Sequence, residues 1–384
     1  MQIVRVVVAF IVFISIGIKA HSQTDTCNLR ISLLTCSPGE ELYSTFGHTA
    51  VRVTDASTGM DMVFNYGTFD DSDPNFYLNF TKGLMNYALS AYPFADFVYE
   101  YQSEHRGVIE QVLSLSCAEK NKLFNALREN AQEKNRFYGY YFHTDNCTTR
   151  ARDIIRRNTD NPVNFRNILP ANTPSYRDLI HSYLDKGHQP WSKFGIDILL
   201  GSNLDKKLSN EQAMFLPDYL LKAFDSATTG NTPLVGATAI ILPTPPSTET
   251  GSWFTPFVLF AALFVVVALL SFSKSTTATR LVRGFDVVFF LLLGLLGLLL
   301  ATLWIIRVDD VCRSNWNLLW ALPTHLPVVF VMNQGKQWVK TYFKAVAIIT
   351  ILLAGTWFVL PQTLNPAIAP ILAIILVRAW CRRK

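Results

Sequence analysis

A single cysteine stands in the stretch FHTDNCTTRARD, residues 142–153, between short polar residues and several arginines. The pattern predicts that Asp145 or Asn146 caps a helix and that Cys147 occupies its first turn. Unpaired amides and the positive end of the helix dipole favour an anion there, and a thiolate is such an anion. Arg150 follows one turn later, and a nearby cation also lowers the pKa of a thiol. These features make Cys147 the best-placed nucleophile in the chain.

A thiol nucleophile normally needs a base, and six of the seven histidines lie before residue 200. The segment TFGHTAVRV places His48 at the head of a predicted strand, directly after a glycine that lets another backbone approach closely. His143 lies four residues before Cys147, but it precedes the predicted cap in an extended segment that points elsewhere. We therefore rank His48 first as the base and His143 second.

Other interpretations of the cysteines remain open. The triplet N-C-T around Cys147 matches the glycosylation pattern, which is a weak signal, and a buried structural thiol is also compatible with the sequence. Cys117 lies in a predicted capping box over an apolar helix face, which favours a structural thiol. Cys27 and Cys36 flank one predicted strand and could form a disulfide bond, and Cys36 is a second candidate nucleophile.

The elements that must position these residues begin with strands. LRISLLTC over 29–36 predicts a buried strand, and GHTAVRVTDASTGMDMVFNYG over 47–67 has the pattern of a β-hairpin. Segments 86–94 and 97–116, which are rich in aromatic and β-branched residues, predict two more strands. Helices are predicted over 116–135, 147–157, 175–185, 193–200 and 210–226. These elements predict an α+β domain.

Hydropathy divides the chain into a soluble half and a membrane half. Half of all residues are apolar, and from residue 253 onward they collect into long uninterrupted blocks. A membrane span needs roughly 20 apolar residues, so the third and fifth of five segments are marginal. The five segments are 253–272, 284–306, 316–332, 342–360 and 364–380. If all five span, the basic loops and the basic C-terminus lie in the cytoplasm and the α+β domain lies outside.

The first 20 residues combine an early arginine with an apolar core and predict a secretory signal, with an uncleaved anchor as the alternative. We expect the exported catalytic domain over 21–226 and the membrane domain over 253–384. Between them, 227–252 is rich in Pro, Thr and Gly and predicts a linker, in which 237–242 could form a strand. No clustered Cys and His ligands and no phosphate-binding glycine loop occur in the sequence. We therefore expect no metal, no nucleotide or other cofactor, and no nucleic acid partner.

A strand-borne histidine and, about a hundred residues later, an Asn-Cys pair at a helix start resemble a known arrangement. It is the circularly permuted papain-like thiol fold of permuted NlpC/P60 enzymes and lecithin:retinol acyltransferases. The chain resembles more closely the bacterial lipoprotein N-acyltransferase family called Lnb, over nearly its entire length beyond the signal. The segments that carry this likeness are ISLLTCSPGEELYSTFGHTAVRV, YGYYFHTDNCTTRARD, PWSKFGIDILLGSNLD and SNWNLLWALPTHL.

The resemblance implies a reaction at the bacterial inner membrane, with the catalytic domain in the periplasm. An acyl chain would pass from a phospholipid to Cys147 as a thioester, and then to the free α-amine of a diacylglyceryl-modified cysteine at the start of a lipoprotein. His48 is implied as the base. Asn65, on the returning strand of the predicted hairpin, is our choice for the group that orients His48, with Asp61 and Tyr66 as competitors.

Several other residues are candidates for substrate binding. Arg52 and Arg150 could hold a lipid phosphate, although salt bridges within the fold are an equal alternative. His325 lies in the third apolar segment, and an ionisable group there is a functional candidate by default. With Asn317 it would lie at the exported face, either as a substrate site or as helix packing. The aromatic segment 74–97 could line an acyl groove or pack in the core.

Two other functions remain open. A thiol peptidase or amidase that acts on cell-wall peptides would use the same fold, but five membrane segments exceed the anchor that such an enzyme needs. A membrane-anchored assembly factor with a structural cysteine is the non-enzymatic alternative.

Overall fold

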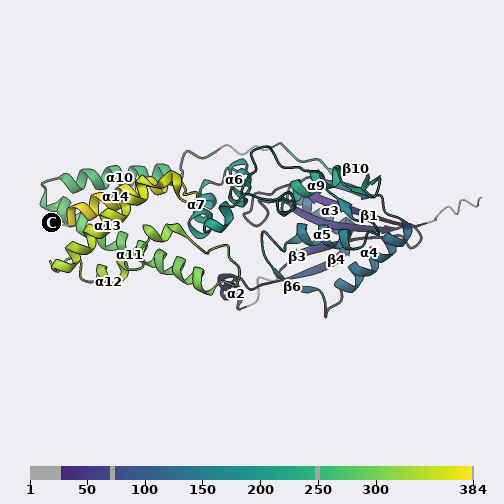
Figure 1. The fold of residues 1–384 in the computed structure, drawn as a ribbon, viewed down its shortest axis with the longest axis horizontal. Coiled ribbons are helices and arrows are strands. Elements are labelled where there is room, and N and C mark those ends of the chain that lie inside the picture. The colour runs from purple at the N-terminus through teal and green to yellow at the C-terminus, as the bar shows by residue number, and fades with distance from the viewer. Residues whose placement is uncertain (1–26, 70–73, 247–250, 383–384) are drawn as a thin grey trace, which may run out of the picture.

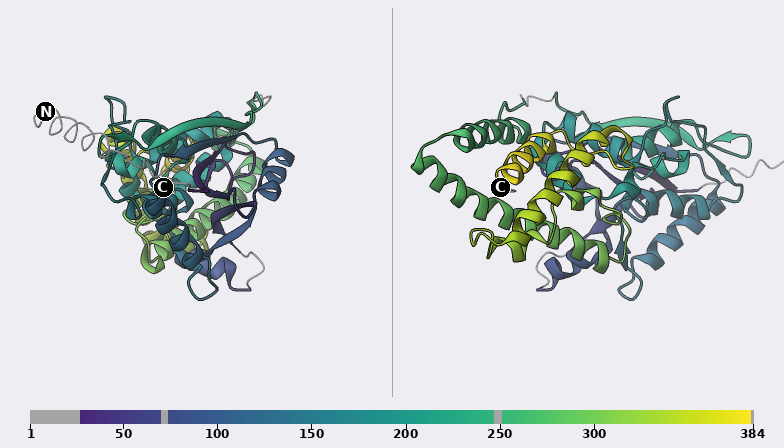
Figure 2. Two further views of the ribbon diagram at one scale, coloured as in Figure 1. Left: turned by 90° about the vertical axis from the view of Figure 1, so that its right-hand side faces the viewer. Right: turned by 60° about the vertical axis from the view of Figure 1, so that its left-hand side comes forward.

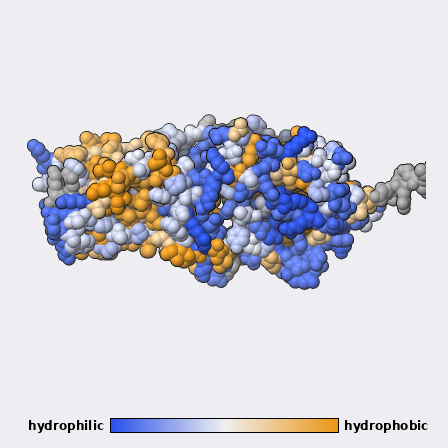
Figure 3. Space-filling model, viewed as in Figure 1, coloured by the Kyte–Doolittle hydropathy of each residue, from blue (hydrophilic) through white to orange (hydrophobic). Residues whose placement is uncertain are grey.

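The computed structural model describes residues 27–69, 74–246 and 251–382, so the predicted signal or anchor over 1–20 lies outside the described residues. An α+β domain and a helical domain lie end to end along the molecule (Figure 1). Hydrophobic residues gather over the surface of the helical domain, whereas hydrophilic ones dominate the surface of the α+β domain (Figure 3). The structure therefore has the α+β part and the helical part that the sequence predicts.

The α+β domain is built on a seven-stranded antiparallel sheet with the order β10-β5-β1-β2-β3-β4-β6. The predicted strand over 29–36 and the predicted hairpin are confirmed, since β1 pairs with β2 and β2 pairs with β3. The bounds of the strands are β1 (Leu29–Cys36), β2 (His48–Asp55), β3 (Met60–Thr68), β4 (Met85–Pro93), β5 (Val108–Leu113), β6 (Phe137–Tyr140) and β10 (Val235–Leu242).

Within the expected linker, the possible strand over 237–242 is present as part of β10, which curves along one edge of the sheet (Figure 2) because its backbone pairs with the otherwise unpaired edge of β5. One segment differs from the sequence-based expectation. The first part of the strand predicted over 97–116 belongs to helix α3 (Phe94–Ser103). α3 buries Phe97 and Tyr101, which lie four residues apart on one helix face. Their helical spacing therefore outweighs their preference for strands.

Helices cover both faces of the sheet. On one face lie α4 (Cys117–Asn130), α5 (Cys147–Arg157) and α9 (Pro217–Asp225), which share a hydrophobic core with the strands. On the other face, α3 packs over a smaller core. α4 begins with the predicted capping box, in which Ser116 accepts a hydrogen bond from the Glu119 amide at 3.2 Å and its own amide donates to the Glu119 carboxylate at 2.8 Å.

Shorter elements complete the α+β domain. Most of them lie between the sheet and the helical domain, where α6 and its neighbours form a core of their own (Figure 1). Pro217 begins α9 and divides the helix predicted over 210–226, because proline is favoured in the first turn of a helix and excluded from its interior. The bounds are α2 (Phe76–Lys82), β7 (Val163–Asn164), α6 (Tyr176–Lys186), α7 (Pro190–Leu199), η1 (Ser202–Asp205), α8 (Asn210–Ala213), β8 (Thr228–Thr229) and β9 (Thr232–Pro233).

The helical domain contains α10 (Pro256–Phe272), α11 (Thr276–Ile306), α13 (Gln337–Gly355) and α14 (Ile368–Arg382), with η3 (Trp357–Val359) before α14. α11 and α13 are long and apolar enough to cross a membrane, and α10 is a shorter apolar helix. The third predicted span is not a single helix, because it consists of η2 (Trp316–Leu319), α12 (His325–Val329) and turns. Pro323 lies in the break between η2 and α12, where its missing amide donor prevents a continuous helix, whereas Pro327 lies in the first turn of α12, where proline is tolerated.

The broken segment nevertheless runs along α11. Gly297 and Gly294 of α11 have no room for a side chain, because the backbones of Ala321 and Leu326 lie against them. At the far end, the guanidinium of Arg382 donates to the carbonyl oxygen of Met332 at 3.0 Å. α13 then returns toward the α+β domain and α14 leads away again, so the C-terminus lies at the end of the molecule opposite the sheet (Figure 1).

Side-chain amides of the helical domain hold the end of α7. Asn315 donates to the carbonyl oxygens of Ile198 and Leu199 at 2.8 and 3.0 Å. Asn317 donates to those of Asp197 and Ile198 at 3.0 and 3.1 Å. Both asparagines are buried. The two domains therefore meet through backbone acceptors as well as through apolar contacts.

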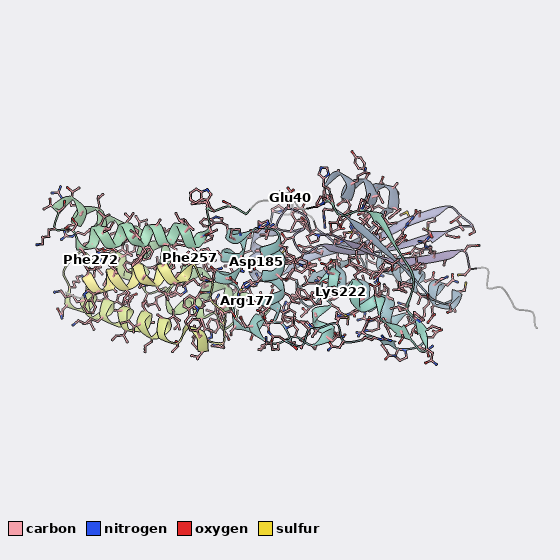
Figure 4. All side chains as sticks on the ribbon, turned by 90° about the horizontal axis from the view of Figure 1, so that it is seen from above. Glu40, Arg177, Asp185, Lys222, Phe257 and Phe272 are labelled. Carbon is pink, nitrogen blue, oxygen red and sulfur yellow. The ribbon has the colours of Figure 1, made fainter. Side chains whose placement is uncertain are left out.

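A buried salt bridge within the α+β domain lies at the same junction. The guanidinium of Arg177, which lies where the two domains meet (Figure 4), contacts Asp197 at 2.9 Å and Asp205 at 3.0 Å. Asp205 also accepts a hydrogen bond from the amide of Thr363 at 3.0 Å, and Gln362 donates to the carbonyl oxygen of Leu200 at 3.0 Å. The hydrogen bonds of Thr363 and Gln362 thus attach the helical domain to residues around this paired cluster.

Candidate active site

Several strand and helix ends meet at the end of the sheet that faces the helical domain. β2 and β4 begin there, β3 and β6 end there, and α5 begins beside them. Met85 at the start of β4 pairs with Tyr140 at the end of β6. The end of α2, just before β4, contacts the helical domain, since the amide of Val308 donates to the carbonyl oxygen of Lys82 at 3.0 Å. The antiparallel order thus brings residues that are distant in the sequence to one edge beside the helical domain.

Cys147 is the first residue of α5, and Asn146 is its cap. The Asn146 side-chain oxygen accepts from the Thr149 amide at 2.9 Å, and the Thr149 hydroxyl accepts from the Asn146 amide at 2.8 Å. The Asn146 side-chain amide donates to the carbonyl oxygens of Phe142 and Phe215 at 2.7 and 2.9 Å. This cap fixes the position of Cys147 and leaves the amides of the first turn without helical acceptors.

The side chains of Cys147 and His48 form a hydrogen bond. Burial alone would raise the pKa of Cys147, but the charge of His48 and hydrogen bonds from His48, the Thr49 amide and Thr148 lower it to about 7. Burial alone would lower the pKa of His48, but Cys147 and a hydrogen bond to Asn65 raise it above its ordinary 6.5. The pair therefore favours the thiolate and the imidazolium, which is the reactive form of a catalytic cysteine.

Asn65 holds the ring of His48. Its Oδ1 lies 2.5 Å from His48 Nε2, so Nε2 carries the hydrogen and Nδ1 faces the sulfur of Cys147. The Asn65 side-chain amide donates to the hydroxyl of Tyr92 at 3.0 Å, which assigns the oxygen of Asn65 to the side of His48. The Tyr92 hydroxyl in turn donates to Glu100 at 3.5 Å. A chain of polar side chains thus sets the orientation of the histidine.

The two competitors for the role of Asn65 have other partners. Asp61 forms a bidentate salt bridge with Arg52, at 2.8 and 2.6 Å, and the hydroxyl of Tyr66 accepts from Asn130 at 2.9 Å. Arg52 also lies 3.4 Å from the centre of the Phe94 ring. The guanidinium of Arg52 is therefore engaged within the fold and does not line the pocket at Cys147. Of the two interpretations of Arg52, a phosphate contact or a salt bridge within the fold, this geometry corresponds to the second.

Two glycines near the Cys147 and His48 side chains have a positive φ. Gly47 has φ 77°, and a Cβ there would lie 2.7 Å from the carbonyl oxygen of Cys36. Gly67 has φ 99° at a bulge of β3, and a Cβ there would lie 3.5 Å from the Cβ of Cys147 and 3.7 Å from Cε1 of His48. Both backbone conformations are ones that other residues rarely adopt.

A pocket of about 420 Å³ opens above Cys147 and His48. One part of its lining is aromatic, and Tyr87 stacks on Tyr140 there with ring centres 4.1 Å apart. Another part carries charge, from Glu100, Glu104 and Arg106. The remaining lining residues are Tyr43, Ser44, Gly47, Asn65, Gly67, Thr68, Phe69, Ser90, Tyr92 and Tyr101. Within the described residues, no group of His, Cys, Asp and Glu side chains is arranged to hold a metal ion.

The other cysteines do not have these surroundings. None of the six, all of which lie in the described part of the chain, forms a disulfide bond. The disulfide considered between Cys27 and Cys36 is absent because the extended strand β1 separates them. Cys36 is fully buried, and burial raises its pKa to about 12, so it stays a protonated thiol and is unsuited as a nucleophile.

Arg150 and His143 face away from Cys147. Arg150 binds Asp145 through two hydrogen bonds of 2.7 Å and lies 3.6 Å from the centre of the Tyr138 ring. His143 is buried with its Nε2 3.9 Å from Asp310 of the helical domain. The sequence-based expectation that His143 points elsewhere matches this geometry.

Asn317 and His325 lie apart from the pocket at Cys147. The side-chain amide of Asn317 donates to backbone carbonyl oxygens at the end of α7, and its side-chain oxygen accepts from the indole of Trp320 at 3.0 Å. His325 is buried between helices, where its Nδ1 is hydrogen-bonded to the Tyr342 hydroxyl at 2.7 Å and its ring lies against Phe290. These contacts correspond to the packing alternative.

No sequence motif singled out Tyr92, Glu100, Arg106 or Gly67. Tyr92 falls in the aromatic segment 74–97, so aromatic density was its signal. Glu100 and Arg106 were hidden by the assignment of α3 as a strand, because a strand would not place Glu100 beside Tyr92. The glycine in NYGT lies at the end of a predicted strand, where a glycine often marks a β-bulge or a point at which another part of the chain approaches the backbone closely.

Two family models match the chain. The one described as the Lnb N-terminal periplasmic domain matches residues 19–182, and the one described as the Lnb transmembrane domain matches residues 248–383. No curated protein and no solved structure matches it. The first match contains Cys147, His48 and Asn65, and the second contains the helices from α10 to α14. The chain therefore belongs to the Lnb family, with a periplasmic N-terminal domain and a transmembrane C-terminal domain.

Proposed function

We propose that the chain is a lipoprotein N-acyltransferase. It moves an acyl chain from a phospholipid through a thioester on Cys147 to the α-amine of a diacylglyceryl-modified cysteine at the start of a lipoprotein. The observation that carries the proposal is the hydrogen-bonded array of Cys147, His48 and Asn65 at a partly aromatic pocket beside the helical domain. Membership in the Lnb family supports the same class of reaction.

The first half-reaction forms the thioester. The Cys147 thiolate attacks the ester carbonyl carbon of the phospholipid, and free amides of the first turn of α5 donate to the oxyanion that develops. The bond from that carbon to the glycerol oxygen then breaks. The leaving oxygen takes the proton from Nδ1 of the His48 imidazolium, so the products are a lysophospholipid, the acyl thioester and a neutral histidine.

The second half-reaction transfers the acyl group. The neutral α-amine of the lipoprotein attacks the thioester carbon, and Nδ1 of His48 accepts the proton that the amine loses. The carbon–sulfur bond breaks, an amide forms, and the thiolate and imidazolium are restored. A thioester divides one difficult acyl transfer into two easier ones. Asn65 keeps the hydrogen on Nε2, so Nδ1 alone exchanges protons in both halves.

The pocket has a chemistry that suits both substrates. Its aromatic part, with Phe69, Tyr87 and Tyr140, accommodates an acyl chain. In its charged part, two carboxylates stand against one guanidinium, that of Arg106, and the excess negative charge attracts the α-ammonium of an acceptor. Both substrates are held in a bilayer, so a pocket beside the membrane domain meets them at high local concentration.

We further infer the orientation of the molecule in the inner membrane. The α+β domain lies on the periplasmic side, and the basic residues at the opposite end of the helical domain lie in the cytoplasm. In this arrangement the broken third segment counts as a crossing, since it runs along α11, and the C-terminus is cytoplasmic. The residues concerned are Lys274, Arg280, Arg283, Lys336, Lys340, Arg378 and Arg382.

The test compares Cys147→Ala with Cys27→Ser, a change outside the pocket. Cells that depend on each variant are analysed by mass spectrometry of the N-terminal peptides of their lipoproteins. We expect Cys147→Ala to abolish N-acylation and Cys27→Ser to leave it unchanged. Full N-acylation in Cys147→Ala would refute the acyltransferase proposal.

A second measurement separates this function from its rivals. Purified wild-type protein, incubated with phospholipid and no acceptor, should carry an acyl group on the peptide containing Cys147, and hydroxylamine should release it. A cell-wall peptidase or amidase would form no such adduct from phospholipid, and an assembly factor would form none from any substrate.

A further inference from the structure

A second pocket, of about 250 Å³, lies at the opposite end of the molecule from Cys147. It is formed by the end of α10, the start of α11 and the end of α14, near the C-terminus in Figure 1. Among the residues that the structure describes, none of those lining it carries a carboxylate. Its lining consists of Leu270, Ser271, Thr279, Val282, Arg283, Arg378, Cys381 and Arg382.

The floor of this pocket is a buried charge cluster. Asp286 is fully buried, and Arg378 binds both of its oxygens, at 2.7 and 2.9 Å. Arg382 binds the same carboxylate and donates as well to Asn333 at 3.2 Å. One carboxylate thus neutralises only one of two guanidinium groups, of which that of Arg378 is buried and that of Arg382 is partly buried. A buried excess charge is costly unless a further anion compensates it.

The rim adds a third guanidinium and the floor retains free donors. Arg283 is exposed and forms no ion pair with any residue that the structure describes. Arg378 uses three of its five N–H groups, two on Asp286 and one on Ser271, which leaves two for a ligand. Three arginines against one aspartate leave an excess of two positive charges around the cavity.

We propose that this pocket binds the phosphate of an anionic phospholipid from the leaflet opposite the α+β domain. The fork of donors on a guanidinium matches phosphate oxygens, and a lipid with net negative charge compensates the excess that a zwitterionic lipid leaves. Basic pockets between transmembrane helices at a membrane surface bind lipid headgroups by this chemistry. The proposal is independent of the reaction at Cys147, since the two pockets share no residue.

The experiment uses the full chain, purified in detergent and depleted of lipid. Retention of added phosphatidylglycerol and of phosphatidylcholine is measured by native mass spectrometry for the wild type, Arg283→Gln and Arg280→Gln. Arg283 is chosen because it is exposed, so its replacement leaves the buried cluster paired. Arg280 is the matched control, since it is exposed on the same helix and does not line the pocket.

We expect the wild type to retain phosphatidylglycerol in preference to phosphatidylcholine. One basic group near the membrane surface contributes to the binding free energy of an anionic lipid. Its loss in Arg283→Gln should therefore weaken the binding of phosphatidylglycerol about fivefold. Arg280→Gln should bind it like the wild type.

Three results would overturn the proposal. The first two are equal retention of the two lipids by the wild type and equal retention of phosphatidylglycerol by the two variants. The third comes from a separate thermal-unfolding measurement, in which inorganic phosphate would stabilise the protein as much as phosphatidylglycerol does. The last of these would assign the pocket to a soluble anion instead of a lipid.

Discussion

Cys147 should become a thiolate about two pH units earlier than an ordinary cysteine. Its pKa is about 7 instead of 9.0, a difference of about 2.7 kcal/mol in favour of the thiolate. At pH 7 half of the Cys147 side chains are then ionised, against about 1% for a thiol with the ordinary value. In His48→Gln the imidazolium charge is lost while burial remains, so the pKa of Cys147 should rise above that of an ordinary thiol.

The assay is the rate of alkylation by iodoacetamide as a function of pH, read by mass spectrometry of the peptide 137–150. The midpoint of the rate curve is the diagnostic quantity, because a thiolate of low pKa is also a weaker nucleophile and its plateau rate is lower. Cys36 serves as an internal reference, since its pKa of about 12 and its burial should keep it unlabelled. We expect a midpoint near 7 in the wild type and above 9 in His48→Gln.

Two results would contradict this reasoning. A wild-type midpoint near 9 would mean that His48 and Cys147 do not form the ion pair. An unchanged midpoint in His48→Gln would mean that the thiolate is stabilised by the helix start and the Thr49 amide alone.

Three further predictions concern the residues around the pair and the junction of the domains. Asn65→Ala removes one hydrogen bond to a charged ring, so the rate of acyl transfer should fall about tenfold to a hundredfold. Asn65→Asp keeps the acceptor and should restore part of the rate, and equal rates in the two variants would argue against an orienting role. Gly67 and Gly59, which lies in the distant β2–β3 turn, both have a positive φ, so replacing either by Ala should lower the free energy of unfolding by about 1–3 kcal/mol. Only Gly67→Ala should also slow the alkylation of Cys147, because Gly59 is far from it. Asn317→Ala leaves its buried hydrogen-bond partners unpaired, which costs about 1–3 kcal/mol of folding free energy for each, so the thermal stability in detergent should fall. The alkylation midpoint of Cys147 should stay near 7, and a shifted midpoint would show that the junction also affects the site around Cys147.

The pairing of Cys147 with His48 was predictable because each residue carries a local signal. A polar cap before Cys147 and a glycine before His48 are visible in the sequence, and the hairpin that brings Asn65 back toward His48 follows from strand alternation. The support of Asn65 was not predictable, since Tyr92 and Glu100 come together only when α3 folds as a helix over the sheet. Aromatic residues fit strands and helices alike, so propensity alone does not decide that assignment.

The helical domain shows the same limit. Apolar composition predicts five crossings, but it does not reveal that the third is broken near Pro323 and packs by backbone contact on two glycines of α11. The role of Asn317 was equally hidden, because its acceptors are backbone oxygens of a helix more than a hundred residues away. A sequence pattern carries no signal for an acceptor that every residue possesses.

The amides of Asn315, Asn317 and Gln362 act as a helix cap supplied from another domain. A helix ends with carbonyl groups that have no partner of their own, and in α7 the membrane part of the chain provides their donors. The last turn of α7 is therefore complete only after the membrane helices have assembled. An isolated periplasmic fragment would expose these carbonyls and fray there. The recognised groups belong to the main chain, so these hydrogen bonds depend on the side chains of the donors and not on those of the accepting residues.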